Sequence, residues 1–200
     1  MASAVPTTWV SYPDYLEIER TGDPKHEWLN GRVFAMAGGT LAHSGLAVAV
    51  ASELRALALP RGCQVFSSDA RVRVRATGLA SYPDASVVCG AVERDPEDRN
   101  AMVNPVVLVE VLSETTEAYD RGAKFAHYRE IPALRDYVLL SQCERRIEVY
   151  SRDGEGLWVL REARGNGGVP IAALQGVLDL DRVYAGIELE APPGRGVRIG

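Results

Sequence analysis

The sequence predicts a single α/β (α+β) domain in which a mixed β-sheet is flanked by helices. The run from Pro105 to Leu112 is almost entirely Val and Leu, as in a central strand that is buried on both faces. The stretch from Leu41 to Leu59 has the apolar spacing of a helix. Strand-like and helix-like segments mix without strict alternation, which favours a mixed sheet.

The first half of the chain is expected to hold two helices and several short strands. Pro13 or Asp14 lies near the start of the first helical pattern, Gly38-Gly39-Thr40 precedes the second, and Asn30-Gly31 is a strong turn signal before a strand. We expect helices over 12–20 and 41–59, and strands over 32–36, 64–67, 70–76 and 85–89.

The second half contains the predicted buried strand and the helix that follows it. Thr115 or Thr116 can cap this helix, which should run to about Arg129. Further strands are expected over 136–140, 146–150 and 156–161, with a short strand and one helical turn after Leu174. We expect residues 1–200 to form one domain with its core over about 12–186 and loose ends.

Composition excludes several classes of protein. A net charge of −5 argues against a protein that coats nucleic acid nonspecifically. No apolar run approaches the roughly 18 residues of a membrane span, and no secretory signal is visible at the N-terminus. The three cysteines, Cys63, Cys89 and Cys143, are widely spaced, so we expect neither a disulfide framework nor a zinc site. These features predict a cytoplasmic protein without a membrane partner.

The basic residues are unusual because almost all of them are arginines. Of 22 basic residues only Lys25 and Lys124 are lysines, which leaves 22 − 2 = 20 arginines. A lysine that remains can do what arginine cannot, since arginine stays protonated and carries a broad planar group. Chance explains either lysine equally well.

Three arginines alternate with valines along one predicted strand. Arg71, Arg73 and Arg75 should share one face, because strand side chains alternate with a period of two. Such a face could hold the phosphates of a nucleic acid, and an ordinary solvated strand face is at least as good an interpretation.

Two carboxylates are candidates for metal binding. Glu110 lies inside the Val and Leu run, where an ionised carboxylate needs an ion-pair partner or a metal. Asp84 follows Pro83 at the start of another strand and alone would be an ordinary turn residue. If the two strands are neighbours, both carboxylates can converge on a hard cation such as Mg²⁺. The alternative for Glu110 is a structural ion pair.

Lys124 lies on the helix that leaves the Glu110 strand. Asp120 and Tyr128 stand four residues before and after it, with His127 close by, so they share roughly one helix face. This arrangement fits a solvated face with an Asp–Lys pair. It also fits a lysine that points at the sheet edge and orients or deprotonates a water molecule.

In order along the chain, Pro83-Asp84, Val109-Glu110-Val111-Leu112-Ser113, Asp120 and Lys124 resemble the PD-(D/E)xK nuclease superfamily. Most members carry the lysine two residues after the acid, where this chain has Leu112. The order of motifs is similar to the Uma-type "putative restriction endonuclease" family of bacteria, in which the lysine has migrated to the helix. Glu27 before Asn30-Gly31, His43 at a helix start, and Tyr128 and Asp136-Tyr137 after the lysine extend the resemblance over roughly 12–184.

The resemblance implies a restriction-endonuclease-like fold and a metal-dependent endonuclease. It implies Asp84 and Glu110 as ligands of Mg²⁺ or Mn²⁺, Lys124 as the catalytic lysine and Glu27 as an accessory acid, although a surface ion pair explains Glu27 as well. The backbone carbonyl of Val111 is a further expected ligand, and His43 is expected to be structural.

The predicted activity is hydrolysis of phosphodiester bonds in nucleic acid, with DNA as the expected substrate and a homodimer as a possible assembly. The alternatives are a catalytically silent nucleic-acid-binding or regulatory module on the same fold, and a metal-dependent enzyme that acts on a small phosphorylated substrate.

Overall fold

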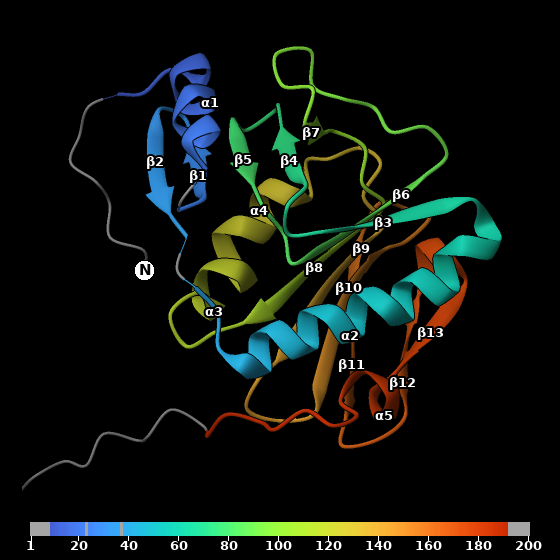
Figure 1. Ribbon diagram of the computed structural model, residues 1–200. Coiled ribbons are helices and arrows are strands. Elements are labelled where there is room, and N and C mark those ends of the chain that lie inside the picture. The colour runs from blue at the N-terminus through green and yellow to red at the C-terminus, as the bar shows by residue number, and fades with distance from the viewer. Residues whose placement is uncertain (1–8, 23, 37, 192–200) are drawn as a thin grey trace, which may run out of the picture.

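The computed structural model describes residues 9–22, 24–36 and 38–191 (Figure 1), so the loose ends expected at 1–8 and 192–200 lie outside the described residues. The helices are α1 (Tyr12–Thr21), α2 (Leu41–Ala58), α3 (Glu117–Tyr119), α4 (Phe125–Tyr128) and α5 (Leu180–Val183), with 3₁₀ turns at Leu59–Arg61 and Ala172–Leu174 and a π-helical turn at Asp120–Lys124. The strands are β1 (His26–Leu29), β2 (Arg32–Ala35), β3 (Cys63–Ser67), β4 (Arg71–Val74), β5 (Leu79–Ser81), β6 (Ala85–Cys89), β7 (Ala101–Met102), β8 (Val107–Leu112), β9 (Asp136–Ser141), β10 (Arg146–Arg152), β11 (Trp158–Arg164), β12 (Gly168–Ile171) and β13 (Gly176–Asp179).

The strands form two mixed sheets and a small hairpin. The larger sheet has the order β11-β10-β9-β8-β6-β3, in which β8 and β9 are parallel and the other pairs are antiparallel. The second sheet has the order β2-β1-β5-β4-β7, and β12 pairs with β13. The prediction of a mixed sheet flanked by helices is confirmed, whereas its division into two sheets was not foreseen.

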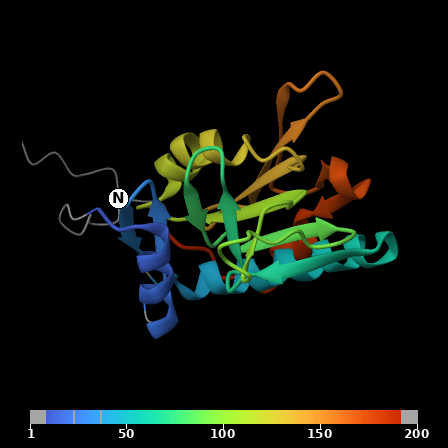
Figure 2. The same cartoon turned by 90° about the horizontal axis from the view of Figure 1, so that it is seen from above.

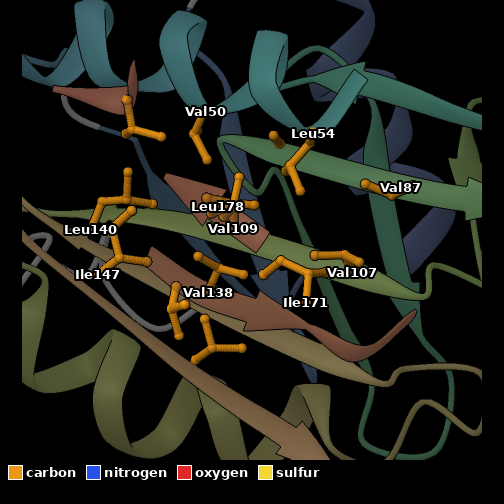
Figure 3. Packing of buried hydrophobic residues seen from close by; sticks show 14 of the residues in the cluster. Val50, Leu54, Val87, Val107, Val109, Val138, Leu140, Ile147, Ile171 and Leu178 are labelled. Carbon is orange, nitrogen blue, oxygen red and sulfur yellow. The ribbon is translucent and has the colours of Figure 1, made fainter. Parts of the chain in front are cut away.

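Helix α2 covers one face of the larger sheet. Thr40 caps its start, since the Thr40 side chain accepts a hydrogen bond from the His43 backbone N–H at 3.1 Å. Its buried residues repeat every fourth position, which gives a single apolar stripe: Ala42, Leu46, Val50, Leu54 and Ala58. Figure 3 shows this stripe packed on alternate residues of the strands, together with Ile171 and Leu178 of the β12–β13 hairpin. Burying each Val or Leu contributes roughly 1.5–3 kcal/mol.

The opposite face of the larger sheet packs against α4 and the second sheet. Leu108, Leu112 and Leu139 point to this side, where they meet Tyr128 of α4 and Val72 of β4. In Figure 2 α2 and α4 lie on opposite sides of the strands. The acidic and basic residues predicted for the site come from the elements around this second core.

The expected elements are largely present, but several strands were not foreseen. These are β1, which carries Glu27, the short strands at residues 79–81 and 101–102, and the first strand of the β12–β13 hairpin. The expectation of no disulfide was wrong, because Cys63 and Cys89 stand opposite each other on β3 and β6 and are bonded. Sequence spacing carries no information on this cross-strand pairing. Within the described residues no helix is long and apolar enough to cross a membrane.

Candidate active site

Strand β8 turns one acidic residue toward the second core. Val107, Val109 and Val111 pack under α2, so Leu108, Glu110 and Leu112 point to the other face. Glu110 is 5% exposed, and it is buried as its position in the apolar run predicted. Its partners must therefore come from the elements packed on that face.

Asp84 stands beside β8 on the neighbouring strand, as the carboxylate-pair hypothesis required. Strands β6 and β8 are antiparallel, with Ala85 opposite Val109. The ladder ends there, and Asp84 Oδ2 accepts a hydrogen bond from the Val111 backbone N–H at 2.7 Å. This bond fixes the Asp84 carboxylate next to the end of β8. Val111 thus contributes its N–H to the site, whereas a metal bond to its carbonyl stays a prediction.

Lys124 lies at the centre of a buried group of three carboxylates. Its ammonium is 2.9 Å from Glu110 Oε1, 3.0 Å from Glu27 Oε1 and 3.4 Å from Asp120 Oδ1. Lys124 itself is only 5% exposed, so the interpretation as a solvated Asp–Lys pair is wrong. The lysine sits at the end of the π-helical turn, an irregularity that is frequent at functional sites.

The charges in this group are strongly coupled. Burial raises the pKa of Glu110 well above its usual value, and the charges of Asp120, Asp84 and Glu27 raise it further. Burial also raises the pKa of Asp120. Burial acts to lower the pKa of Lys124, but the carboxylates of Glu110 and Glu27 outweigh this effect and raise it. This group therefore contains more acidic than basic side chains.

Two tyrosines hold the acidic group in place. The Tyr128 hydroxyl donates to Glu110 Oε1 at 2.8 Å and lies 3.0 Å from the Ser81 hydroxyl of β5. The Tyr137 hydroxyl donates to the backbone carbonyl of Asp120 at 3.1 Å. Helical spacing puts Tyr128 and Asp120 on the same helix face as Lys124 but indicates no partner for Tyr128. The structure shows that Asp120 completes the group.

The start of α2 is joined to the same end of β8. His43 Nε2 lies 3.4 Å from Asp84 Oδ2, and this hydrogen bond raises the pKa of His43. The Thr40 hydroxyl donates to Gln142 Oε1 at 2.6 Å, and the Gln142 amide donates to the Leu112 carbonyl at 2.7 Å. His43 lies in the first turn of α2, as expected of a structural residue. Its side chain also contacts Asp84, which is a candidate metal ligand. No sequence signal indicated Gln142.

The strand that carries Arg71, Arg73 and Arg75 does not present all three side chains to solvent. Arg71 is buried, hydrogen-bonds to the hydroxyl of Tyr82 and pairs with Asp98. Arg73 is buried, with its guanidinium 4.1 Å from the centre of the Tyr12 ring. The expectation of exposure was wrong for both, because α1 covers this side of the second sheet. Arg75 remains half exposed and pairs with Asp95 at 2.8 Å. Phosphate contacts by these arginines stay a prediction.

Lys25, Asp136 and His127 lie outside the acidic group. Lys25 is half-buried and pairs with Asp69, so this ion pair accounts for the lysine without a catalytic role. Asp136 accepts hydrogen bonds from the Ser151 hydroxyl and the Ala173 N–H, so it joins β9 to neighbouring segments. Burial lowers the pKa of His127.

The donor set suits a hard divalent cation. The hydrogen bonds found among the described residues fall on Oδ2 of Asp84 and Oε1 of Glu110, which leaves the second oxygen of each as a ligand atom. Asp120 Oδ1 and Glu27 Oε1 are buried and accept no hydrogen bond, although both lie within ion-pair distance of Lys124. Mg²⁺ commonly takes one or two carboxylates and completes its shell with water and phosphate oxygens. In the part of the chain that is described, no cluster of three or more His, Cys, Asp or Glu is arranged as a ready-made metal site.

Known proteins share this combination of fold and sequence. Residues 12–181 match the family model Uma2, described as "Putative restriction endonuclease". The chain belongs to the Uma2 family. Its Synechocystis sp. relatives include the uncharacterized proteins slr1290 and sll1609. The first is 33% identical over 92% of this chain and 96% of its own, and the second is 30% identical over 76% and 86%.

A solved structure supports the same fold. The crystal structure of a putative nuclease belonging to DUF820 from Anabaena variabilis superposes with a TM-score of 0.66. The match covers 81% of this chain and 90% of that chain at 16% identity, so it shows the fold alone. The Uma2 chain thus has the mixed α/β fold that its sequence predicted, in a family described as "Putative restriction endonuclease".

Proposed function

We propose that this Uma2 protein is a metal-dependent endonuclease that hydrolyses phosphodiester bonds in nucleic acid, with DNA as its substrate. The observation that carries the proposal is the convergence of Asp84, Glu110 and Lys124 on one end of β8. Asp84 is fixed by the Val111 N–H at 2.7 Å, and the Lys124 ammonium lies 2.9 Å from Glu110. Two carboxylates and a lysine are the set that this chemistry requires.

Each residue has a defined part in the proposed reaction. Asp84 and Glu110 would hold Mg²⁺ or Mn²⁺, with the carbonyl of Val111 as a further ligand. The bound cation supplies activation of a water molecule and neutralises charge on the phosphate oxygens. Lys124 provides a fixed positive charge next to Glu110, where it can orient the attacking water and stabilise negative charge that develops in the transition state. Glu27 would act as an accessory acid that positions Lys124.

A catalytically silent nucleic-acid-binding module is the second candidate. The observation in its favour is that Glu27, Glu110 and Asp120 are already paired with the Lys124 ammonium, as in a structural ion-pair group that needs no metal. In this reading the acidic group is structural.

Plasmid cleavage separates the two candidates. Purified protein should nick supercoiled DNA with Mg²⁺ or Mn²⁺ and not with EDTA. Asp84→Asn, Glu110→Gln and Lys124→Arg should each lower the rate at least about 10²-fold, which is the usual weight of acid–base and electrostatic groups. Lys25→Arg controls for lysine loss, because Lys25 pairs with Asp69 away from the group. Binding of DNA without any metal-dependent nicking would favour the silent module.

A further inference from the structure

Strand β11 is one edge of the larger sheet, and its outer side has no strand partner among the described residues. Its inner side pairs with β10 in antiparallel register, from Arg146↔Arg164 to Arg152↔Trp158. In Figure 2 the hairpin of these two strands, in orange, stands out from the body of the molecule. Across the described chain, no backbone group outside β10 hydrogen-bonds to the backbone of residues 158–162. An open edge of this kind is a template for pairing with another chain.

Hydrogen bonds at the two ends of the hairpin show which backbone groups of β11 face outward. The Asp153 N–H donates to the Leu157 carbonyl at 2.9 Å, and the Gly165 N–H donates to the Arg145 carbonyl at 2.8 Å. Hydrogen-bonded and non-hydrogen-bonded pairs alternate along an antiparallel ladder, so the odd-numbered residues of β11 bond to β10. The N–H and C=O groups of its even-numbered residues therefore point out of the sheet edge.

The first half of this edge is apolar and exposed. Of the nine exposed large apolar side chains among the described residues, three lie within four consecutive positions: Leu157 at 61%, Val159 at 38% and Leu160 at 47%. Strand β11 contains neither Pro nor Lys, and its register with β10 has no bulge. These are common devices that keep an edge strand from pairing, so the apolar half of β11 lacks them.

Charge is distributed unevenly along the hairpin. The turn before β11 carries the exposed acids Asp153 and Glu155, and the second half of the strand carries the exposed Arg161 and Arg164. Glu162 lies between the two arginines and pairs with Arg164 at 2.6 Å. Two copies aligned antiparallel along this edge would place the acidic turn of one copy beside the basic end of the other. The edge is therefore complementary to itself.

We propose that the protein forms a two-fold dimer in which β11 of one copy pairs antiparallel with β11 of the second copy. The two-fold axis passes between the two Val159 residues, so that Trp158 of each copy lies opposite Leu160 of the other. Self-complementary interfaces of this kind are the commonest in homo-oligomers. Because the axis is perpendicular to the joined sheet, the faces that carry Glu110 lie on the same side in both copies. The inference concerns assembly and does not depend on cleavage.

The charges of β11 select this register. A register centred on Arg161 or on Glu162 would place two like charges directly opposite each other, which destabilises a strand pair. A register centred on Leu160 would set the two Arg161 side chains diagonally across the pair. The register centred on Val159 opposes no like charges and brings the turn that carries Glu155 next to Arg161 of the other copy.

Sedimentation velocity over a series of protein concentrations tests the dimer and its axis. The native protein should sediment as a dimer. Val159→Lys and Val159→Glu each place two like charges opposite each other across the axis, so each variant should sediment as a monomer. An equimolar mixture of the two variants should recover the dimer, because opposite charges then face each other. Val48→Lys and Val48→Glu are the matched controls, since Val48 is 70% exposed on α2, and both should stay dimeric.

Cross-linking checks the register independently of a charge on the strand. Val159→Cys, combined with Cys143→Ser, should give a disulfide-linked dimer on oxidation, because a non-hydrogen-bonded pair brings its Cα atoms to about 4.5 Å, within the range of a disulfide. Arg161→Cys in the same background is the control, since its two copies would be offset by four residues, roughly 13 Å along the strand. A native protein that sediments as a monomer would overturn the inference. So would folded Val159→Lys and Val159→Glu proteins that remain dimers, or equal cross-linking of the two cysteine variants.

Discussion

At the scale of single residues, Tyr128 is the neutral group that joins the acidic cluster to the second sheet. Its fully buried hydroxyl donates to Glu110 and contacts Ser81. Tyr128→Phe should lower the free energy of unfolding by about 1–2 kcal/mol, since it deprives a buried carboxylate of a hydrogen bond and leaves no cavity. Urea denaturation measures the change. Tyr150→Phe is the control, because its ring also packs in this core against Phe125, and among the described residues no hydrogen bond joins it to Glu110. An equal effect of the two substitutions would contradict a special role for Tyr128.

The residues that could be predicted are those whose type conflicts with their neighbours. Glu110 was evident because an acid interrupts a Val and Leu strand, and Lys124 because lysine is rare in this chain. Gln142 is an ordinary polar residue in an ordinary position, and the spacing of Tyr128 from Lys124 marked its helix face without indicating its partner. Their roles arise from contacts between segments 30 and 18 residues apart. Burial of Arg71 and Arg73 was missed for the same reason, because alternation predicts a face but not what covers it.

At the scale of elements, long periodic segments were predicted well and irregular ones were not. Helix α2 ends within one residue of its expected limits, because its apolar stripe and its Thr40 cap are both visible in the sequence. The helix expected over 115–129 is instead α3, the π-helical turn and α4 in succession. A π-turn inserts an extra residue into a helical turn, and residue propensities do not distinguish it from an α-helix. The structure reveals it through the inward positions of Asp120 and Lys124.

The disulfide between β3 and β6 gives a prediction for an element pair. Strand β3 is the edge of the larger sheet, and the Cys63–Cys89 bond closes a loop with a sequence separation of 26. Chain-entropy arguments give about 3–4 kcal/mol for a loop of this length. Cys63→Ser with Cys89→Ser should therefore lower the free energy of unfolding by this amount under oxidising conditions, as urea titration would detect. Cys143→Ser is the control, since Cys143 is free. A loss near zero would mean that the strand pairing needs no bond.

At the scale of the whole molecule, two sheets meet around one acidic group. Glu27 comes from the second sheet and Glu110 from the larger one, while Lys124 comes from the helical segment that packs between them. The sequence indicated the strand of Glu110 but not the strand of Glu27, and not which strands share a sheet, because pairing depends on contacts between distant segments. The site is thus assembled only when both sheets have formed. Assembly of two copies into a homodimer and a cytoplasmic location stay predictions.

The whole-molecule charge predicts how the protein should bind a duplex. The net charge is −5, and Arg71, Arg121, Arg146 and Arg164 are ion-paired within the described chain. We therefore expect few phosphate contacts, and three of them would give a plot of log affinity against log salt concentration a slope of about −3. Fluorescence anisotropy of a labelled duplex between 50 and 200 mM KCl, with EDTA to prevent cleavage, measures this slope.

Arg75→Ala should flatten the slope by about one unit if this half-exposed arginine contacts a phosphate, because one fewer counterion is released. A slope steeper than about −6 would reveal an open basic surface. The paired arginines would then have to exchange their carboxylates for phosphates on binding, on β4 of the second sheet for Arg71 and on the π-helical turn and strands β10 and β11 for the other three.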